Sequence, residues 1–150
     1  MQDKVKLQQE FISYISYEIE PLAVDEWEES GDPTEALDIN WEGYFALESS
    51  GNLKVFTARL DEELVGYIVV VTVAPLTNRT KVIGYFDSVF VVKSERKSSI
   101  ARRLIKFTEG CLKKDGINTV IASSSEQNPI GNFLTRLGYE AFETKHKKVL

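Results

Sequence analysis

Apolar positions along this chain switch between a period of two and a period of three to four. Val5 and Leu7 alternate with lysines, which indicates a short first strand. The spacing then lengthens to that of a helix, from about Glu10 to Glu29. Pro21 falls inside this helix, so we expect a kink or a restart there. A second, shorter helix is predicted over Trp41–Ser49.

The middle of the chain has the pattern of β-strands. Leu53–Leu60 and Leu64–Val73 are rich in β-branched residues and flank the charged turn Asp61–Glu63, which predicts a hairpin. A polar turn follows, and the β-branched and aromatic run Gly84–Val92 predicts a long central strand.

The last third of the chain alternates between helix and strand patterns. Apolar residues at helical spacing predict a helix over Ser99–Lys114, and Ile117–Ala122 is the next expected strand. This order predicts a right-handed crossover with locally parallel pairing. Asn128 is a candidate cap for a further helix, because a proline follows it in the first turn. We expect Tyr139–Leu150 to form a final strand or strand pair.

Composition indicates one domain over residues 1–150, with 43% apolar and 27% charged residues. The net charge of −5 argues against sequence-independent binding to nucleic acid. Acidic residues gather between Asp25 and Glu42, as a solvated helix face and loop or as an acidic rim that attracts a cationic substrate. Cys111 is the single cysteine, and neither a signal peptide nor a membrane span is apparent. We therefore expect a cytoplasmic protein without disulfides or a multi-cysteine metal site.

One strand-to-helix turn carries most of the functional information. The central strand runs through Lys93-Ser-Glu-Arg-Lys-Ser-Ser99, which has no large apolar residue, into the helix that follows. The first-turn amides of a helix have no intrahelical partner, and the helix dipole adds partial positive charge there. This geometry holds phosphate. Ser98 and Ser99 are also ordinary helix caps, an interpretation that fits any strand–helix unit.

Few side chains qualify as an acid or a base. Asp87 is predicted within the apolar central strand, on the face of Tyr85 and Val89, where a carboxylate needs a partner or a raised pKa. It is a candidate base or a hydrogen-bonded structural residue. Glu126, after the fifth strand, is the second candidate base or an ordinary loop residue. Three aromatic residues are candidates for an acceptor pocket or for the core: Trp27, Trp41 and Tyr44.

The element order and several segments resemble the GNAT acyl-CoA N-acetyltransferases. Val91–Ala101 resembles the family's coenzyme A segment, a Val-x-Pro run followed by Arg/Gln-x-x-Gly-x-Gly/Ala. Phe133–Tyr139 resembles the late helix that ends in Leu-Gly-Phe/Tyr, and Leu64–Tyr67 matches the hairpin. The segment Asp38–Tyr44 is similar to a subgroup common in tailed-bacteriophage genomes.

The resemblance implies an α+β fold, with a mostly antiparallel sheet splayed between the fourth and fifth strands and about four helices. It implies acetyl-CoA as cosubstrate, no metal, and direct transfer to an amine acceptor such as a protein lysine, an N-terminus or a small amine. A homodimer and a host-protein target are possible partners, whereas nucleic acid and membrane are not expected. The implied cofactor-binding residues are Phe90, Val91, Arg96, Lys97, Ser98, Ser99, Ile100, Ala101 and Asn128.

Two residues depart from the family pattern. Ser99 stands at the first signature glycine, where the backbone approaches phosphate closely. Leu134 stands where many members place the tyrosine that protonates the leaving thiolate, so Tyr139, a water or a serine of 123–125 would have to serve. The alternative to an active enzyme is a GNAT-fold binding module, such as a phage virion component or an inhibitor of a host protein.

Overall fold

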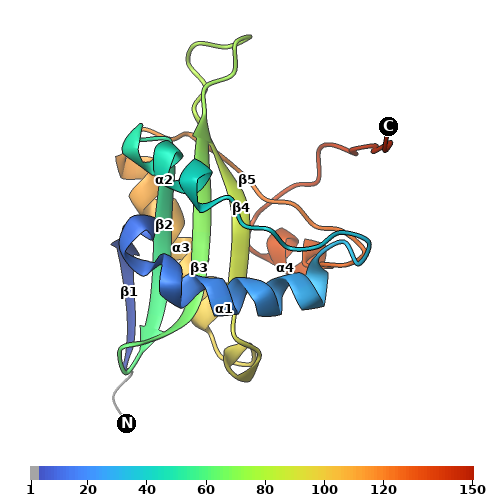
Figure 1. The fold of residues 1–150 in the computed structure, drawn as a ribbon. Coiled ribbons are helices and arrows are strands. Elements are labelled where there is room, and N and C mark those ends of the chain that lie inside the picture. The colour runs from blue at the N-terminus through green and yellow to red at the C-terminus, as the bar shows by residue number, and fades with distance from the viewer. Residues whose placement is uncertain (1–3) are drawn as a thin grey trace.

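The computed structural model describes residues 4–150 and contains a five-stranded sheet with helices on both faces (Figure 1). The strands lie in the order β1-β2-β3-β4-β5. Their bounds are β1 Val5–Glu10, β2 Leu53–Leu60, β3 Glu63–Val73, β4 Ile83–Val91 and β5 Thr119–Ile121. The helices are α1 Ile12–Ser30, α2 Trp41–Ser49, α3 Ile100–Lys114 and α4 Gly131–Arg136, with a 3₁₀ turn, η1, at Lys93–Glu95.

The sheet opens between its last two strands. β1 to β4 pair antiparallel in chain order, and β5 adds parallel to β4 after the crossover through α3. This parallel pairing covers only Ile83–Tyr85 of β4. Among the described residues, no strand pairs with the outer edge of β4 over Phe86–Val91. The predicted α+β fold, with a mostly antiparallel sheet splayed at this place, is therefore confirmed.

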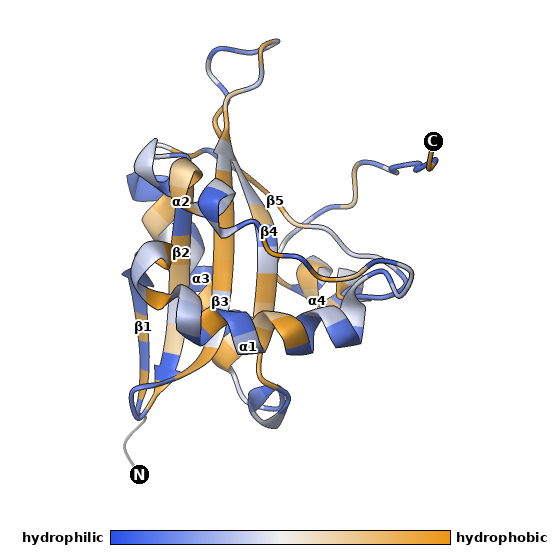
Figure 2. Cartoon of the chain, in the orientation of Figure 1, coloured by the Kyte–Doolittle hydropathy of each residue, from blue (hydrophilic) through white to orange (hydrophobic). Residues whose placement is uncertain are grey.

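Two apolar cores lie on opposite faces of the sheet. Figure 2 shows apolar residues along nearly all of β3, which contributes to both cores. On one face, the helical spacing of Ile12, Ile15 and Ile19 turns one side of α1 onto the sheet. On the other face, α3 buries Ile100, Leu104, Ile105 and Leu112.

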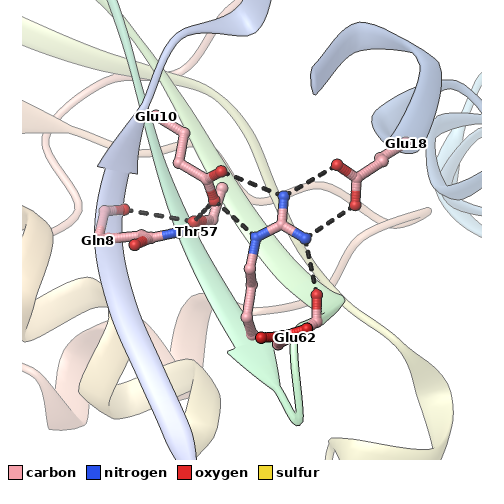
Figure 3. A network of polar contacts seen from close by, with 6 residues as sticks. Gln8, Glu10, Glu18, Thr57 and Glu62 are labelled. Carbon is pink, nitrogen blue, oxygen red and sulfur yellow. Dashed lines mark hydrogen bonds and ion pairs between the residues drawn. The ribbon is translucent and has the colours of Figure 1, made fainter. Parts of the chain in front are cut away.

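A cluster of charged side chains fastens α1 to the edge of the sheet (Figure 3). Arg59 on β2 donates to both carboxylate oxygens of Glu10 at 2.9 and 3.1 Å and of Glu18 at 2.8 and 3.0 Å. It also donates to the Glu62 carbonyl, while Thr57 donates to Glu10. The Arg59 side chain is only 13% exposed, so these contacts are shielded from water and fix the start of α1.

Helix α2 supplies the N-terminal cap of α1. Phe11, at the N-cap position, makes no side-chain cap bond. The Glu48 carboxylate instead accepts hydrogen bonds from the Ile12 amide at 2.6 Å and from the amide and hydroxyl of Ser13. A carboxylate at a helix N-terminus satisfies orphan amides and complements the dipole. The two helices are thereby held together over one face of the sheet.

Several predicted boundaries differ from the structure. Helix α1 passes through Pro21 without a restart, because contacts with the sheet hold its apolar face on both sides of the proline. Strand β5 is shorter than the predicted Ile117–Ala122. Helix α4 begins after Asn128, which is not its cap: the N-cap residue is Ile130, without a side-chain cap bond.

The final strand predicted over Tyr139–Leu150 is wrong. No strand or helix is present there, and residues 140–150 are all exposed. Figure 2 shows the C-terminal segment as mostly hydrophilic. The segment Thr144–Lys148 is polar throughout, so it has no apolar face to bury against the sheet. Lys147 of this segment forms a solvent-accessible ion pair with Asp32 at 3.2 Å.

Candidate functional site

A β-bulge in β4 sets the geometry of the site. Two consecutive residues of β3 pair with Phe86 and Ser88, which leaves Asp87 between them as the extra residue. Asp87 and Ser88 consequently both face α1 and α2, whereas Phe86 and Val89 pack toward α3. The prediction that Asp87 shares a face with Val89 is wrong, because the bulge shifts the alternation of side chains by one residue.

A cavity of about 350 Å³ lies between this part of the sheet, α1, α2 and the segment that joins the two helices. Among the described residues, its lining includes no lysine, arginine or histidine. The aromatic residues predicted for a pocket or for the core are in its wall. Two carboxylates and four aromatic rings contribute to the lining: Glu26, Asp87, Trp27, Trp41, Tyr44 and Tyr67.

Glu26 is a partly buried carboxylate whose oxygens are held by hydroxyl groups. The Ser88 hydroxyl lies 2.6 and 2.7 Å from its two oxygens, and the Tyr67 hydroxyl donates at 2.7 Å. Burial raises the pKa of Glu26, and the charges of Asp87 and Glu29 act in the same direction, although the hydroxyl donors oppose them. The proton affinity of Glu26 is therefore higher than that of an ordinary glutamate.

Asp87 is the second carboxylate of the cavity and is paired with α2. The Tyr44 hydroxyl donates to Asp87 at 2.9 Å. Burial, and then the negative charge of Asp87, raise the pKa of Tyr44 far above its usual range. Tyr44 therefore stays protonated and serves as a hydrogen-bond donor.

The start of α3 is the place at which the sequence predicts a phosphate site. Ser99 is its N-cap residue, makes no side-chain cap bond, and has a φ of −83°, so serine adopts this backbone without strain. The Ser98 hydroxyl accepts from the Ile100 amide at 3.3 Å. Among the described residues, the Ala101 and Arg102 amides donate no hydrogen bond within the protein. These two amides belong to the first turn of α3, which follows β4 and η1 in the chain.

The predicted cofactor residues before the helix are already engaged within the protein. Arg96 donates from Nε to the Val91 carbonyl at 2.8 Å and from its guanidinium to Glu29 at 2.6 Å, and it lies over the Phe90 ring. The side chains of Phe90 and Val91 are buried in opposite cores. These two residues can therefore offer a ligand only backbone groups. Lys97 is exposed in the loop.

The remaining predicted site residues lie outside the cavity lining. Glu126 is exposed in the loop after β5. The Tyr139 hydroxyl donates to Glu109 on α3 at 2.6 Å, and burial raises its pKa. Asn128 is half-buried in the same loop as Glu126, where its amide donates to Ser125. The structure thus brings Asp87 to the cavity but not Glu126 or Tyr139.

Sequence reasoning missed Glu26 and Tyr67 as site residues. Glu26 belongs to an acidic run that resembles a solvated helix face, and Tyr67 lies in an apolar strand, where it is 1% exposed. The available signal was the helical spacing of Glu26 from Ile19 and Leu22, which places a carboxylate on the buried side of α1.

Within residues 4–150, no group of three or more histidine, cysteine, aspartate or glutamate side chains gathers in a way that could hold a metal ion. In the same range, no helix has both the length and the apolar character needed to cross a membrane.

Comparison with known families identifies the class of protein that this fold and site define. Residues 14–139 match the family described as the acetyltransferase (GNAT) family. The chain therefore belongs to the GNAT acetyltransferases, as its sequence motifs indicated. No curated protein sequence matches it.

Solved structures similar to this chain share its fold over nearly the full length. An aminoglycoside acetyltransferase from an uncultured soil metagenomic sample, in complex with sisomicin, has a TM-score of 0.76 at 17% identity, with 98% of this chain and 97% of that chain covered. A ribosomal-protein-alanine N-acetyltransferase from Brucella melitensis biovar Abortus 2308 has a TM-score of 0.75 at 16% identity, with 97% and 98% covered. A predicted acetyltransferase with acetyl-CoA from Clostridium acetobutylicum has a TM-score of 0.74 at 14% identity, with 97% and 96% covered.

Proposed function

We propose that this protein is an acetyl-CoA-dependent N-acetyltransferase that transfers an acetyl group directly to an amine in a ternary complex. The observation that carries the proposal is the departure of β4 from β5 after Tyr85. It leaves one edge of β4 without a partner strand, on the same stretch that carries Asp87 and Ser88 to the cavity. Acetyl-CoA bound along that edge and an amine bound in the cavity would therefore meet at the bulge.

The residues of the open edge and of the α3 start fit acetyl-CoA. The Ala101 and Arg102 amides offer donors for a diphosphate, and Lys97 adds positive charge beside them. Backbone groups between Ser88 and Val91 offer amide partners to the pantetheine arm. When bound, acetyl-CoA supplies an activated acyl carbon. The chain's part is to position that carbon and to receive the proton of the amine.

Donor binding is tested by calorimetry with acetyl-CoA on the wild type, Ser99→Asp and Gln9→Glu. Aspartate is a favoured N-cap residue, so Ser99→Asp should keep or raise thermal stability. Its carboxylate would occupy the amides that hold the diphosphate, so affinity should fall by at least about tenfold. Gln9→Glu adds the same charge on an exposed position of β1, at the far edge of the sheet, and should bind like the wild type. Wild-type protein that binds no acetyl-CoA at millimolar concentration would overturn the proposal.

A second candidate function is a GNAT-fold binding module without turnover, for which a phage virion component or an inhibitor of a host protein remains the sequence-based prediction. The observation that favours it is Leu134, which is 7% exposed and stands where many family members have a proton-donating tyrosine. Release of coenzyme A thiol in the presence of an amine would exclude this candidate. We also propose a cytoplasmic location, where the free Cys111 would stay reduced.

A further inference from the structure

We infer that the cavity between α1, α2 and the bulge of β4 binds a small cationic amine with an apolar or aromatic body and no anionic group, and that Glu26 receives its proton. This inference rests on the proposed function, since it names the acceptor class of the same site.

The charge of the lining selects the amine and rejects anions. Glu26 and Asp87 both border the cavity, and among the described residues no basic side chain lines it. An ammonium group close to both carboxylates is attracted, whereas a carboxylate or phosphate on the ligand has no counter-ion and faces two like charges. Free amino acids and phosphorylated amines are therefore poor occupants.

The walls select the body of the ligand. Trp41 lies against Tyr44, with ring centroids 5.8 Å apart, and Trp27 and Tyr67 complete the aromatic lining. Aromatic faces attract a cation and pack well against apolar groups. A volume of about 350 Å³ is at the lower end of the range of small-molecule pockets, which favours a compact amine over a peptide segment.

Glu26 is the carboxylate suited to receive the proton. It is held by donors from two strands, Tyr67 on β3 and Ser88 on β4, so it is fixed in position. Ser88 belongs to the part of β4 whose other edge is open. The Glu26 carboxylate is thus hydrogen-bonded, through the Ser88 hydroxyl, to the strand along which acetyl-CoA is proposed to lie.

The transfer step balances as follows for a primary ammonium. The Glu26 carboxylate takes one proton from the nitrogen, whose freed electron pair forms the bond to the acyl carbon while the carbon–sulfur bond breaks. The departing sulfur keeps the electron pair of that bond and receives the second proton lost by the nitrogen. The products are the N-acetyl amide and coenzyme A thiol, and Glu26 releases its proton to water.

Binding is measured first without acetyl-CoA, by intrinsic tryptophan fluorescence. Both tryptophans of the chain, Trp27 and Trp41, line the cavity, so the signal reports on this site directly. Phenethylamine and phenylalanine form a matched pair that differs by one carboxylate. We expect phenethylamine to bind at least about tenfold more tightly. Equal binding of the two, or no binding of phenethylamine at millimolar concentration, would overturn the inference without affecting the acetyl-CoA result.

Turnover is measured next, by coenzyme A thiol release, with Glu26→Gln and Glu28→Gln as matched variants. Glu28 is an exposed glutamate on the same helix, so its variant controls for the lost charge. Glu26→Gln should lower kcat by about 10² or more, because glutamine cannot take the proton, and Glu28→Gln should not. A Glu26→Gln enzyme as active as the wild type, or acetylation of a lysine-rich peptide but not of phenethylamine, would contradict the inference. If acetyl-CoA itself fails to bind, the proposed function is what has failed.

The pH profile separates proton transfer from a structural role of Glu26. The groups that face Glu26 are Tyr67 of β3, Asp87 and Ser88 of β4, Tyr44 of α2 and Glu29 of its own helix. Ser88→Ala removes a hydroxyl that lowers the pKa of Glu26, so the acidic limb of kcat should move to higher pH. A limb that stays in place in Ser88→Ala would show that Glu26 does not titrate in the reaction.

Discussion

The Ser88 hydroxyl lies within 2.7 Å of both carboxylate oxygens of Glu26, and this contact joins α1 to the bulged part of β4. The helix residue and the strand residue are 62 positions apart in the sequence. Because Tyr67 donates to the same carboxylate, two adjacent strands, β3 and β4, hold one ionisable group on a helix. A fixed carboxylate beside the open edge of β4 is the central element of the proposed site.

Glu26 should destabilise the folded protein at neutral and alkaline pH. Burial raises its pKa above the ordinary value of 4.5, so the folded state binds the proton more tightly than the unfolded chain. Stability is therefore lost as the pH rises from below 4.5 through the raised pKa. Glu26→Gln removes this loss, and its melting temperature should exceed that of the wild type by a margin that grows between pH 4.5 and pH 8. A variant that is less stable than the wild type at pH 8 would contradict this expectation.

Replacing Arg59 by methionine should destabilise the protein by about 3 kcal/mol at pH 7, because two shielded carboxylates lose their counter-ion. Burial raises the pKa of Glu10, but hydrogen bonds from Arg59 and Thr57 outweigh it, and hydrogen bonds from Arg59 lower the pKa of Glu18. The stability that these groups contribute is present above the ordinary value of 4.5 and is lost as the pH falls through the lowered pKa values. The difference between variant and wild type, measured by urea unfolding, should therefore shrink on acidification.

The control for Arg59 is an ion pair that is open to water. Lys4 and Asp61 lie 3.7 Å apart, and both side chains are 66% exposed. Lys4→Met should change the free energy of unfolding by less than about 0.5 kcal/mol. A loss equal to that of Arg59→Met would show that charge in general, rather than shielding, sets the effect.

Substitutions in the turn between β2 and β3 should raise the stability of the protein without changing the candidate site. Asp61 and Glu62 have φ values of 50° and 72°, although neither is glycine. Left-handed backbone costs non-glycine residues roughly 1 kcal/mol, and Asn-Gly is the preferred pair for a two-residue turn with two positive φ values. The double substitution to Asn-Gly should raise the free energy of unfolding by about 1 kcal/mol in urea titrations and leave acetyl transfer unchanged. An unchanged or lower value would mean that the contact between Arg59 and the Glu62 carbonyl depends on the native turn.

Tyr139→Phe tests whether this hydroxyl protonates the leaving thiolate. The Tyr139 hydroxyl already donates to Glu109 and its pKa is raised, so it is a weak general acid. We expect kcat to stay within about threefold of the wild type, and stability to fall by about 1 kcal/mol because Glu109 loses a partner. A fall in kcat of about 10² or more would instead assign the proton transfer to Tyr139.

The sequence predicted those elements whose local pattern agrees with their packing. The bounds of α2 and β2 are as predicted, because a cap, turn residues and apolar periodicity coincide there. The strand predicted over Tyr139–Leu150 is wrong, since Lys145, Lys147 and Lys148 leave this segment without an apolar face to bury. The local sequence pattern does not show whether a segment has an element to pack against.

The site was less accessible to sequence reasoning than the fold. The segment at the start of α3 that we propose binds coenzyme A carries a recognisable motif, because backbone geometry there depends on local residues. The role of Glu26 depends on Tyr67 and Ser88, which are distant in the sequence. Asp87 was chosen as a candidate but placed on the wrong face with respect to Val89, because nothing in the local pattern of β4 signals a bulge.

The extra residue in β4 implies that chain length is more constrained than residue identity between Phe86 and Val91. Deleting one residue there would exchange the inward and outward positions of everything that follows in the strand. Phe90 and Val91 would trade sides, and each core would receive a side chain of the wrong shape. Substitutions at Asp87 or Ser88 should change the chemistry of the candidate site with only a small loss of stability. Insertions and deletions in this stretch should instead abolish folding.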